Sequence, residues 1–262
     1  LKSKAISLVL AGGLIAAILG PEVSRYSFDF FHDYIYLATY LFAAIIQIIN
    51  FVILIFIKIK KPQLSKKSHR PLSDILLQKN LIIAILAAAV GYSLMSFIMT
   101  ATPLQIVNVC KLGDSASATV IQWHVIAMFA PSFFTGTIIS SLGNRKVMMI
   151  GLFLYAFSIS FTIIGQTIEH FWIALLLCGL GWNFLYVGGS DIIAKSAFPE
   201  ERAKVQGVTD FIIFIFVATG SFLAGALHSS LGWEIMMFYT SIPILILFVS
   251  IIIIKPDGIK AV

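Results

Sequence analysis

Residues 81–107 read LIIAILAAAVGYSLMSFIMTATPLQIV, an apolar stretch without a single charged side chain. At 1.5 Å per residue, a helix of this length measures about 40 Å, more than the roughly 30 Å thickness of a bilayer's hydrocarbon core. The apolar residues run continuously and do not alternate with polar ones, so the stretch is not a strand of a β-barrel. It predicts a membrane-spanning helix.

The same pattern recurs along the chain. Of its 262 residues, 59% are apolar and only 11% are charged, whereas a soluble domain carries roughly 25% charged residues. We therefore predict an all-α integral membrane protein with eight transmembrane helices. The predicted spans are residues 6–22, 34–57, 80–107, 117–142, 147–165, 171–194, 205–228 and 233–254.

The placement of Lys and Arg predicts the orientation of these spans. If successive loops alternate between the two sides, Arg25 and Lys111 fall on one side and the other 16 of the 18 basic residues fall on the opposite side. The basic side is expected to be cytoplasmic, which places both chain ends in the cytoplasm and the protein in a bacterial inner membrane. The net charge of +6 thus follows topology, and we expect a lipid bilayer and no nucleic acid as partner.

The longest polar stretch divides the chain into unequal parts. Residues 58–79 contain seven Lys and Arg residues, and Pro62 and Pro71 are expected to break any helix there. We predict two spans in residues 1–57, a cytoplasmic linker at 58–79 and six spans in 80–262.

The first and seventh predicted spans share a layout. Gly220 follows Lys204 by the same number of residues as Gly20 follows Lys4. Paired halves related by such repeats are typical of secondary transporters. Residues 80–262 would then be a complete six-helix C-terminal half, and residues 1–57 the last two helices of an N-terminal half. Four further helices are expected to precede them in the full-length protein.

In this layout the chain resembles the major facilitator superfamily, whose transporters have twelve spans in two six-helix halves. On that resemblance the chain corresponds to helices five to twelve. Gly136, Gly143, Arg145 and Lys146 match the family's signature loop between the second and third helices of a half, with Ser140 at its acidic position. The resemblance implies that this loop takes part in gating.

Two further stretches extend the resemblance. Gly20-Pro21 is similar to a degraded form of the fifth-helix motif of the family's antiporters, but a simple helix bend is the preferred explanation. Residues 120–125 and 130–136 are similar to a bacterial subgroup that includes proposed riboflavin carriers. That similarity implies a planar aromatic solute.

Polar residues inside a membrane are costly and tend to mark a solute path. In the sixth span, polar or small residues recur on one helical face, with an aromatic side chain beside them. Two polar residues of the fourth span are further candidates, but because they lie two positions apart only one can face a cavity. The predicted substrate-binding residues are Gln122, His124, Trp182, Asn183, Tyr186 and Ser190. The alternative is that these residues pack helices together.

Two carboxylates complete the candidate set. Asp191 and Asp210 lie inside predicted spans, where a carboxylate needs a partner or a proton. The resemblance implies that Asp210 contacts a basic loop of the N-terminal half at a cytoplasmic gate. Solvation near the lipid headgroups is the alternative. The predicted gating set is therefore Gly136, Gly143, Arg145, Lys146, Asp191 and Asp210.

The predicted function is transport of a small organic solute by alternating access, with proton coupling left open. Cys110 and Cys178 have no CxxC spacing, and the five histidines are scattered, so we expect no metal and no cofactor. The chain contains no GxxxxGK[ST], HExxH or GxSxG motif, which argues against an ATP-driven pump and a membrane-embedded enzyme. The other alternative is a truncated carrier that is inactive because half of its cavity is missing.

Overall fold

The computed structural model describes residues 2–58 and 70–256, with the backbone alone for residues 2–11. All regular elements in these ranges are helices. They are α1 (Lys2–Ser27), α2 (Leu37–Phe56), α3 (Leu72–Leu76), α4 (Lys79–Pro103), the π-helical turn η1 (Leu104–Val109), α5 (Asp114–Phe129), α6 (Ser132–Leu142), α7 (Asn144–Ile164), α8 (Ile168–Ser196), α9 (Arg202–Leu231) and α10 (Trp233–Ile254).

Six of the described helices are long and apolar enough to cross a membrane: α2, α4 with η1, α7, α8, α9 and α10. The pair α5 and α6 makes a seventh if it is counted as one bent span. The chain is thus an all-α integral membrane protein. The count of eight stays a prediction, because the segment expected at residues 6–22 lies in α1, where part of the side chains are outside the described residues.

The predicted span 117–142 differs from the structure in one respect. It is divided into α5 and α6, which are bent by 44° relative to each other. Pro131 lies directly between them, and a proline ring removes a backbone donor and clashes with the preceding turn. The length of the apolar run predicts one helix over residues 117–142, although Pro131 lies within it.

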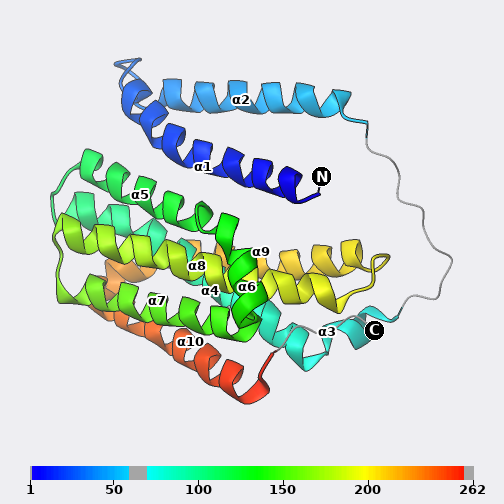
Figure 1. The fold of residues 1–262 in the computed structure, drawn as a ribbon. Coiled ribbons are helices and arrows are strands. Elements are labelled where there is room, and N and C mark those ends of the chain that lie inside the picture. The colour runs from blue at the N-terminus through cyan, green and yellow to red at the C-terminus, as the bar shows by residue number, and fades with distance from the viewer. Residues whose placement is uncertain (1, 59–69, 257–262) are drawn as a thin grey trace.

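The helices α4 to α10 form one bundle, and α1 and α2 lie to one side of it (Figure 1). Helix α1 runs alongside α5, and α2 lies beyond α1, where it buries none of its residues. The centre of the bundle is formed by α4 and α8, which bury the largest share of their length. Small residues allow their close approach: a Cβ atom on Gly189 of α8 would lie 2.6 Å from the Ala84 carbonyl oxygen of α4.

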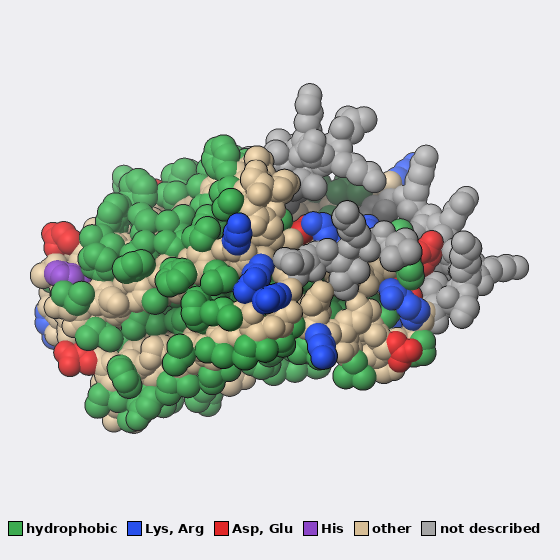
Figure 2. Space-filling view, turned by 60° about the horizontal axis from the view of Figure 1, so that its bottom comes forward, with side chains coloured by type: hydrophobic (Ala, Val, Ile, Leu, Met, Phe, Trp, Pro, Cys, Tyr) green, Lys and Arg blue, Asp and Glu red, His purple; other side chains and the backbone are tan. Residues whose placement is uncertain are grey.

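Hydrophobic side chains cover much of the face shown in Figure 2, and the Lys and Arg side chains lie mostly in its right half. This end of the bundle, called the basic end below, carries Lys79, Arg145, Lys195, Arg202 and Lys255 at helix termini. An apolar belt with basic residues at one end is the surface expected of a protein embedded in lipid. Of the linker predicted at 58–79, residues 59–69 lie outside the described residues.

The described part of that linker contains a helix, which corrects the prediction that its prolines break any helix. Helix α3 begins directly after Pro71. A proline at the start of a helix costs nothing, because the first turn has no intrahelical acceptor for its missing N–H group. Helix α3 packs against α4 and α9.

Arg70, just before α3, is clamped to the turn between α8 and α9. Its guanidinium donates to both carboxylate oxygens of Glu201, at 3.2 and 2.7 Å, and to the Ser196 carbonyl at 3.3 Å. It also lies over the Phe198 ring, 4.5 Å from the ring centre. Glu201 is buried and accepts the backbone N–H groups of Phe198 and Arg70 as well. These contacts hold the pKa of the Glu201 carboxyl down at about 2, with the Arg70 hydrogen bond as the largest cause. The linker therefore ends in a fixed anchor.

Replacing Glu201 by Gln is expected to lower the unfolding temperature at neutral pH, by an amount corresponding to about 1 kcal/mol for a partly exposed ion pair. The folded-state pKa lies below the unfolded value of roughly 4.3. The stabilisation is therefore complete above pH 4.3 and is lost as the pH falls toward 2. Unfolding temperatures of the purified protein at pH 7, 5 and 3 test this. The gap between wild type and Glu201→Gln should be smaller at pH 3 than at pH 7, because the folded-state pKa is only one unit lower than this pH, and Glu200→Gln should produce no such gap. A gap that widens in acid would contradict the prediction.

Candidate functional site

Five aromatic side chains from four helices meet in the bundle and are called the aromatic wall here: Tyr92 (α4), Phe129 (α5), Trp182 and Tyr186 (α8) and Phe214 (α9). The Trp182 and Tyr186 rings are parallel, with centres 5.1 Å apart and an angle of 8°. Tyr92 makes an edge-to-face contact with each of them, with ring centres 5.2 and 5.4 Å apart. The wall thus contains a flat stack fixed in position by neighbouring rings.

The stack follows from sequence spacing. Trp182 and Tyr186 are four residues apart, which places them one turn apart on the same face of α8. Trp182 is 5% exposed, while Tyr186 and Tyr92 are half-buried and Phe214 is 53% exposed. The Trp182 side of the aromatic wall is therefore buried in the protein, and the Phe214 side is exposed.

The indole nitrogen of Trp182 is buried and has no hydrogen-bond partner among the described residues. A buried indole N–H normally has a partner, because leaving it unpaired costs about 1–3 kcal/mol. An acceptor atom on a bound molecule would satisfy it once a neighbouring side chain moves aside, because the nitrogen has no exposed surface in this conformation. This unpaired donor beside a flat ring stack marks the wall as the candidate substrate site.

Polar groups lie between the wall and the basic end. Ser190 follows Tyr186 by one turn on the same face of α8, and the Asp210 carboxylate is close enough to the Tyr186 hydroxyl to interact with it electrostatically. Asp210 also accepts a hydrogen bond of 2.7 Å from Gln206. The structure thus brings together four of the residues predicted from the sequence: Trp182, Tyr186, Ser190 and Asp210.

Asn183, also predicted to bind substrate, lies elsewhere. It is fully buried between α8 and the bend of α5 and α6, where it donates to the Met128 carbonyl at 2.7 Å and to the Ser132 hydroxyl at 2.6 Å. Its amide oxygen accepts a bond of 2.6 Å from the Thr135 hydroxyl. These contacts hold the two segments at their bend. Gly179, one turn away, allows the same approach, since a Cβ there would lie 2.6 Å from the His124 carbonyl oxygen.

The two candidates on α5 face in different directions, as expected for positions two apart. His124 is fully buried against α8, where its Nδ1 lies 2.7 Å from the Leu175 carbonyl oxygen. Its Nε2 has no partner among the described residues. Gln122 faces α1 and donates to the Ile18 carbonyl at 3.0 Å and to Glu22 at 3.4 Å. Neither belongs to the aromatic wall.

Gln122 is part of a polar contact between α1 and α5 at the end opposite the basic end. Arg25 of α1 donates to the Thr119 hydroxyl at 2.6 Å and to the Ser115 carbonyl at 3.4 Å. Arg25 also forms an ion pair with Glu22 at 2.9 Å. Sequence reasoning missed this contact, because Glu22 and Arg25 have the spacing of an ordinary surface pair on one helix, and nothing in the sequence connects them to α5.

The predicted gating loop lies at the basic end. Gly143 adopts a positive φ of 81° between α6 and α7, so the tight turn does require glycine. Asn144 donates to Asp191 at 2.8 Å, and Lys195 pairs with the same carboxylate at 2.5 Å. Arg145 donates to the Ile252 carbonyl at the end of α10, at 3.3 Å. The loop is thus joined to both α8 and α10. The role of Asn144 in this connection was missed.

The remaining candidates make fewer contacts. Gly136 lies exposed on α6 and Lys146 exposed on α7. Helix α1 continues through Pro21 to Ser27, so the predicted bend at Gly20-Pro21 does not end the helix. Both residues line a cavity of about 590 Å³ beside Arg25. Across residues 2–58 and 70–256, no group of three or more His, Cys, Asp or Glu side chains is placed to hold a metal ion.

Known proteins resemble this chain over much of its length. Residues 106–261 match the family described as Major Facilitator Superfamily. The whole chain is 39% identical to the "Riboflavin transporter RfnT" of Brucella anthropi and covers 67% of that protein. Two Bacillus subtilis proteins, "Uncharacterized MFS-type transporter YdeG" and "Uncharacterized MFS-type transporter YddS", are 35% and 30% identical over 56% and 65% of the chain. The matches cover 35% and 39% of those two proteins.

Proposed function

Because the chain belongs to the major facilitator superfamily, we propose that it is the solute-binding part of a secondary carrier for a planar aromatic solute. Members of this family transport solutes and are not enzymes. The observation that carries the proposal is the aromatic wall with its unpaired Trp182 donor. A flat ring system gains about 1–3 kcal/mol by stacking on one aromatic side chain.

The relative from Brucella anthropi is named a riboflavin transporter, and riboflavin is the first solute to test. Its flat ring system carries carbonyl groups. One ring face would lie against the Trp182–Tyr186 stack, and a carbonyl would accept the indole N–H. Ser190 and Asp210 would contact polar groups of the solute on the side of the basic end.

Residues 80–262 would supply one complete half of the carrier and residues 1–57 the end of the other half. The polar contact between α1 and α5 would then join the two halves. We propose that alternating access breaks this contact when the end opposite the basic end opens. The basic end would face the cytoplasm in a bacterial inner membrane. There the loop of Gly136, Gly143, Arg145 and Lys146, with Asp191, would form the second gate.

Solute uptake into proteoliposomes tests the function. The chain alone is compared with a version that carries four additional N-terminal helices, with riboflavin as solute, with and without an imposed proton gradient. Uptake by the extended version supports the carrier, and stimulation by the gradient supports proton coupling. If neither version moves riboflavin or related flavins under either condition, the proposed function is wrong. Uptake by the extended version alone would mean that the shorter chain lacks part of its cavity.

Linking α1 to α5 is expected to stop transport. Glu22→Cys and Gln122→Cys replace two side chains that now lie 3.4 Å apart, in a background where Cys110 and Cys178 are replaced by Ser and Ala. A short, cleavable bis-thiol reagent should lower uptake at least tenfold, and cleaving it should restore uptake. Uptake is measured before linking, after linking and after cleavage. Each single-cysteine variant treated in the same way is the control. Full transport by the linked protein would show that this contact does not open.

A further inference from the structure

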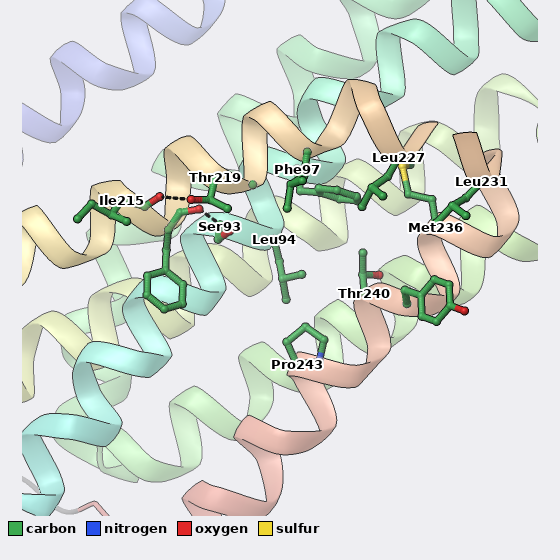
Figure 3. A pocket seen from close by; sticks show the side chains of 14 residues that line it. Ser93, Leu94, Phe97, Ile215, Thr219, Leu227, Leu231, Met236, Thr240 and Pro243 are labelled. Carbon is green, nitrogen blue, oxygen red and sulfur yellow. Dashed lines mark hydrogen bonds between the residues drawn. The ribbon is translucent and has the colours of Figure 1, made fainter. Parts of the chain in front are cut away.

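An apolar groove lies on the outside of the bundle, between α9 and α10 (Figure 3). The two helices diverge over α4 and leave a groove of about 340 Å³. In Figure 3, Ser93, Ile215 and Thr219 lie at one end of the groove, and Leu231 and Met236 lie at the other. The groove is distinct from the aromatic wall, because none of the wall residues lines it.

The groove follows from two local features. At one end of the groove α9 lies close against α4, because Gly220 has no side chain. A Cβ atom at this position would lie 2.5 Å from the Ser93 hydroxyl oxygen. On the other side, Pro243 lies inside α10 and cannot donate the helical hydrogen bond to the Tyr239 carbonyl. Both Pro243 and Tyr239 line the groove.

The lining selects hydrocarbon. The hydroxyl group of each Ser and Thr in the groove donates a hydrogen bond to a backbone carbonyl of a helix. Ser93 donates to Phe216 at 2.8 Å, Thr219 to Ile215 at 2.8 Å and Thr240 to Met237 at 2.5 Å. The other lining residues are mostly Leu, Ile, Phe, Met and Pro. Since α9 and α10 are both long and apolar enough to cross a membrane, the chemistry expected beside them at this depth is that of lipid chains.

At Leu231 the groove meets a polar pocket of about 370 Å³ at the end opposite the basic end. Here His228 Nε2 lies 2.8 Å from the Gln105 amide oxygen, and Gln105 donates to Gln166 at 2.7 Å. Gln105 belongs to the π-helical turn η1, which places its side chain between His228 and Gln166. Such turns are frequent at functional sites. Glu234 lines the pocket and forms no ion pair with any described residue. An unpaired carboxylate at the membrane surface favours a cationic group.

We propose that the groove and the pocket together bind one phospholipid whose headgroup carries an ammonium. One acyl chain lies in the groove along α9, and the ammonium lies beside Glu234. The amide of Gln166 donates to the phosphate. The bound lipid fills the space that Gly220 and Pro243 open between α9 and α10.

The test measures lipid retained by the purified full chain. The protein is reconstituted in bilayers of equal parts phosphatidylethanolamine and phosphatidylglycerol with identical acyl chains, then released in mild detergent. Native mass spectrometry counts each lipid bound per chain. Wild type should retain one molecule and prefer the ethanolamine lipid about threefold, the selectivity of one partly solvated ion pair. Glu234→Gln should still bind lipid but lose the preference.

A variant that fills the groove distinguishes lipid bound in the groove from lipid bound elsewhere on the protein surface. Thr219→Phe should lower retention of both lipids about tenfold, the loss expected when about two methylene groups lose their contacts. The control is Ser241→Phe, which makes a similar change on α10 in the cavity between α7 and α10 and should leave retention unchanged. If Thr219→Phe fails to fold, Ile215→Trp fills the same groove at an exposed position.

Three results would overturn the proposal: equal retention by Thr219→Phe and wild type, an equal loss in Ser241→Phe, or a wild-type preference for the glycerol lipid. Riboflavin that displaced the lipid would overturn it as well, because the groove would then be a solute route. Retention is measured without a solute gradient, so failure of the lipid site leaves the proposed transport untouched.

Discussion

Trp182→Ala is expected to lower riboflavin uptake about tenfold or more. The change removes half of the parallel stack and the buried N–H donor. Together these contacts are worth at least the roughly 1.4 kcal/mol that corresponds to a factor of ten. Initial uptake rates at several riboflavin concentrations, in the version that transports, measure the effect. The loss should appear mainly as a higher KM, because the wall contacts the solute on binding.

The same helix offers a matched control for this prediction. Trp172 also lies on α8, but it packs edge-on against Trp123, with ring centres 5.7 Å apart, away from the wall. Trp172→Ala should change uptake by less than about twofold, as expected for a residue outside the solute path. Tyr186→Phe, which keeps the ring and removes the hydroxyl, should retain most stacking. Equal losses for Trp172→Ala and Trp182→Ala would remove the aromatic wall as the substrate site.

Asn183→Leu is expected to destabilise the protein by about 2 kcal/mol. Leu has a similar volume, but the Met128 carbonyl and the hydroxyls of Ser132 and Thr135 all lose a partner. Side-chain hydrogen bonds between membrane helices average about 0.6 kcal/mol each. The unfolding temperature should fall by several degrees. Ser190→Ala, on the same helix but half-buried, should leave the unfolding temperature nearly unchanged.

This variant also decides between two roles for Asn183. The contacts in the structure point to a residue that fixes the bend between α5 and α6, so the folded fraction of Asn183→Leu should bind riboflavin with unchanged affinity. If the unfolding temperature is unchanged and the affinity falls, Asn183 contacts the solute, as the sequence pattern predicted. Binding is measured from the quenching of riboflavin fluorescence in detergent.

The membrane-spanning character of the chain could be predicted because it depends on length and composition. Helix α10 has the predicted bounds, and α7, α8 and α9 begin and end within about three residues of those expected. The division of α5 from α6 depends on one residue, Pro131, within a long apolar run. The geometry of this bend depends on how α8 packs against it, and hydropathy gives no information about that packing.

The candidate site could be predicted in part for a similar reason. A helical face identified Tyr186 and Ser190, and Trp182 was recognised as its neighbour. Tyr92 was missed because it belongs to α4, and only the packing of α4 on α8 brings it to the wall. The same face also contains Asn183, since helical periodicity gives the direction of a side chain and not the identity of the neighbour it meets.

Helix α2 has a consequence for how the protein is made. It carries no charged residue between Leu37 and Phe56, and none of its side chains is fully buried by the part of the chain that the structure describes. Leu, Ile and Phe each favour insertion from the translocon by about 0.3–0.6 kcal/mol at the centre of a helix. Helix α2 therefore needs no tertiary contact to enter the bilayer. During synthesis it can leave the translocon before α4 to α10 exist, and it holds the growing chain in the membrane while those helices are still being added.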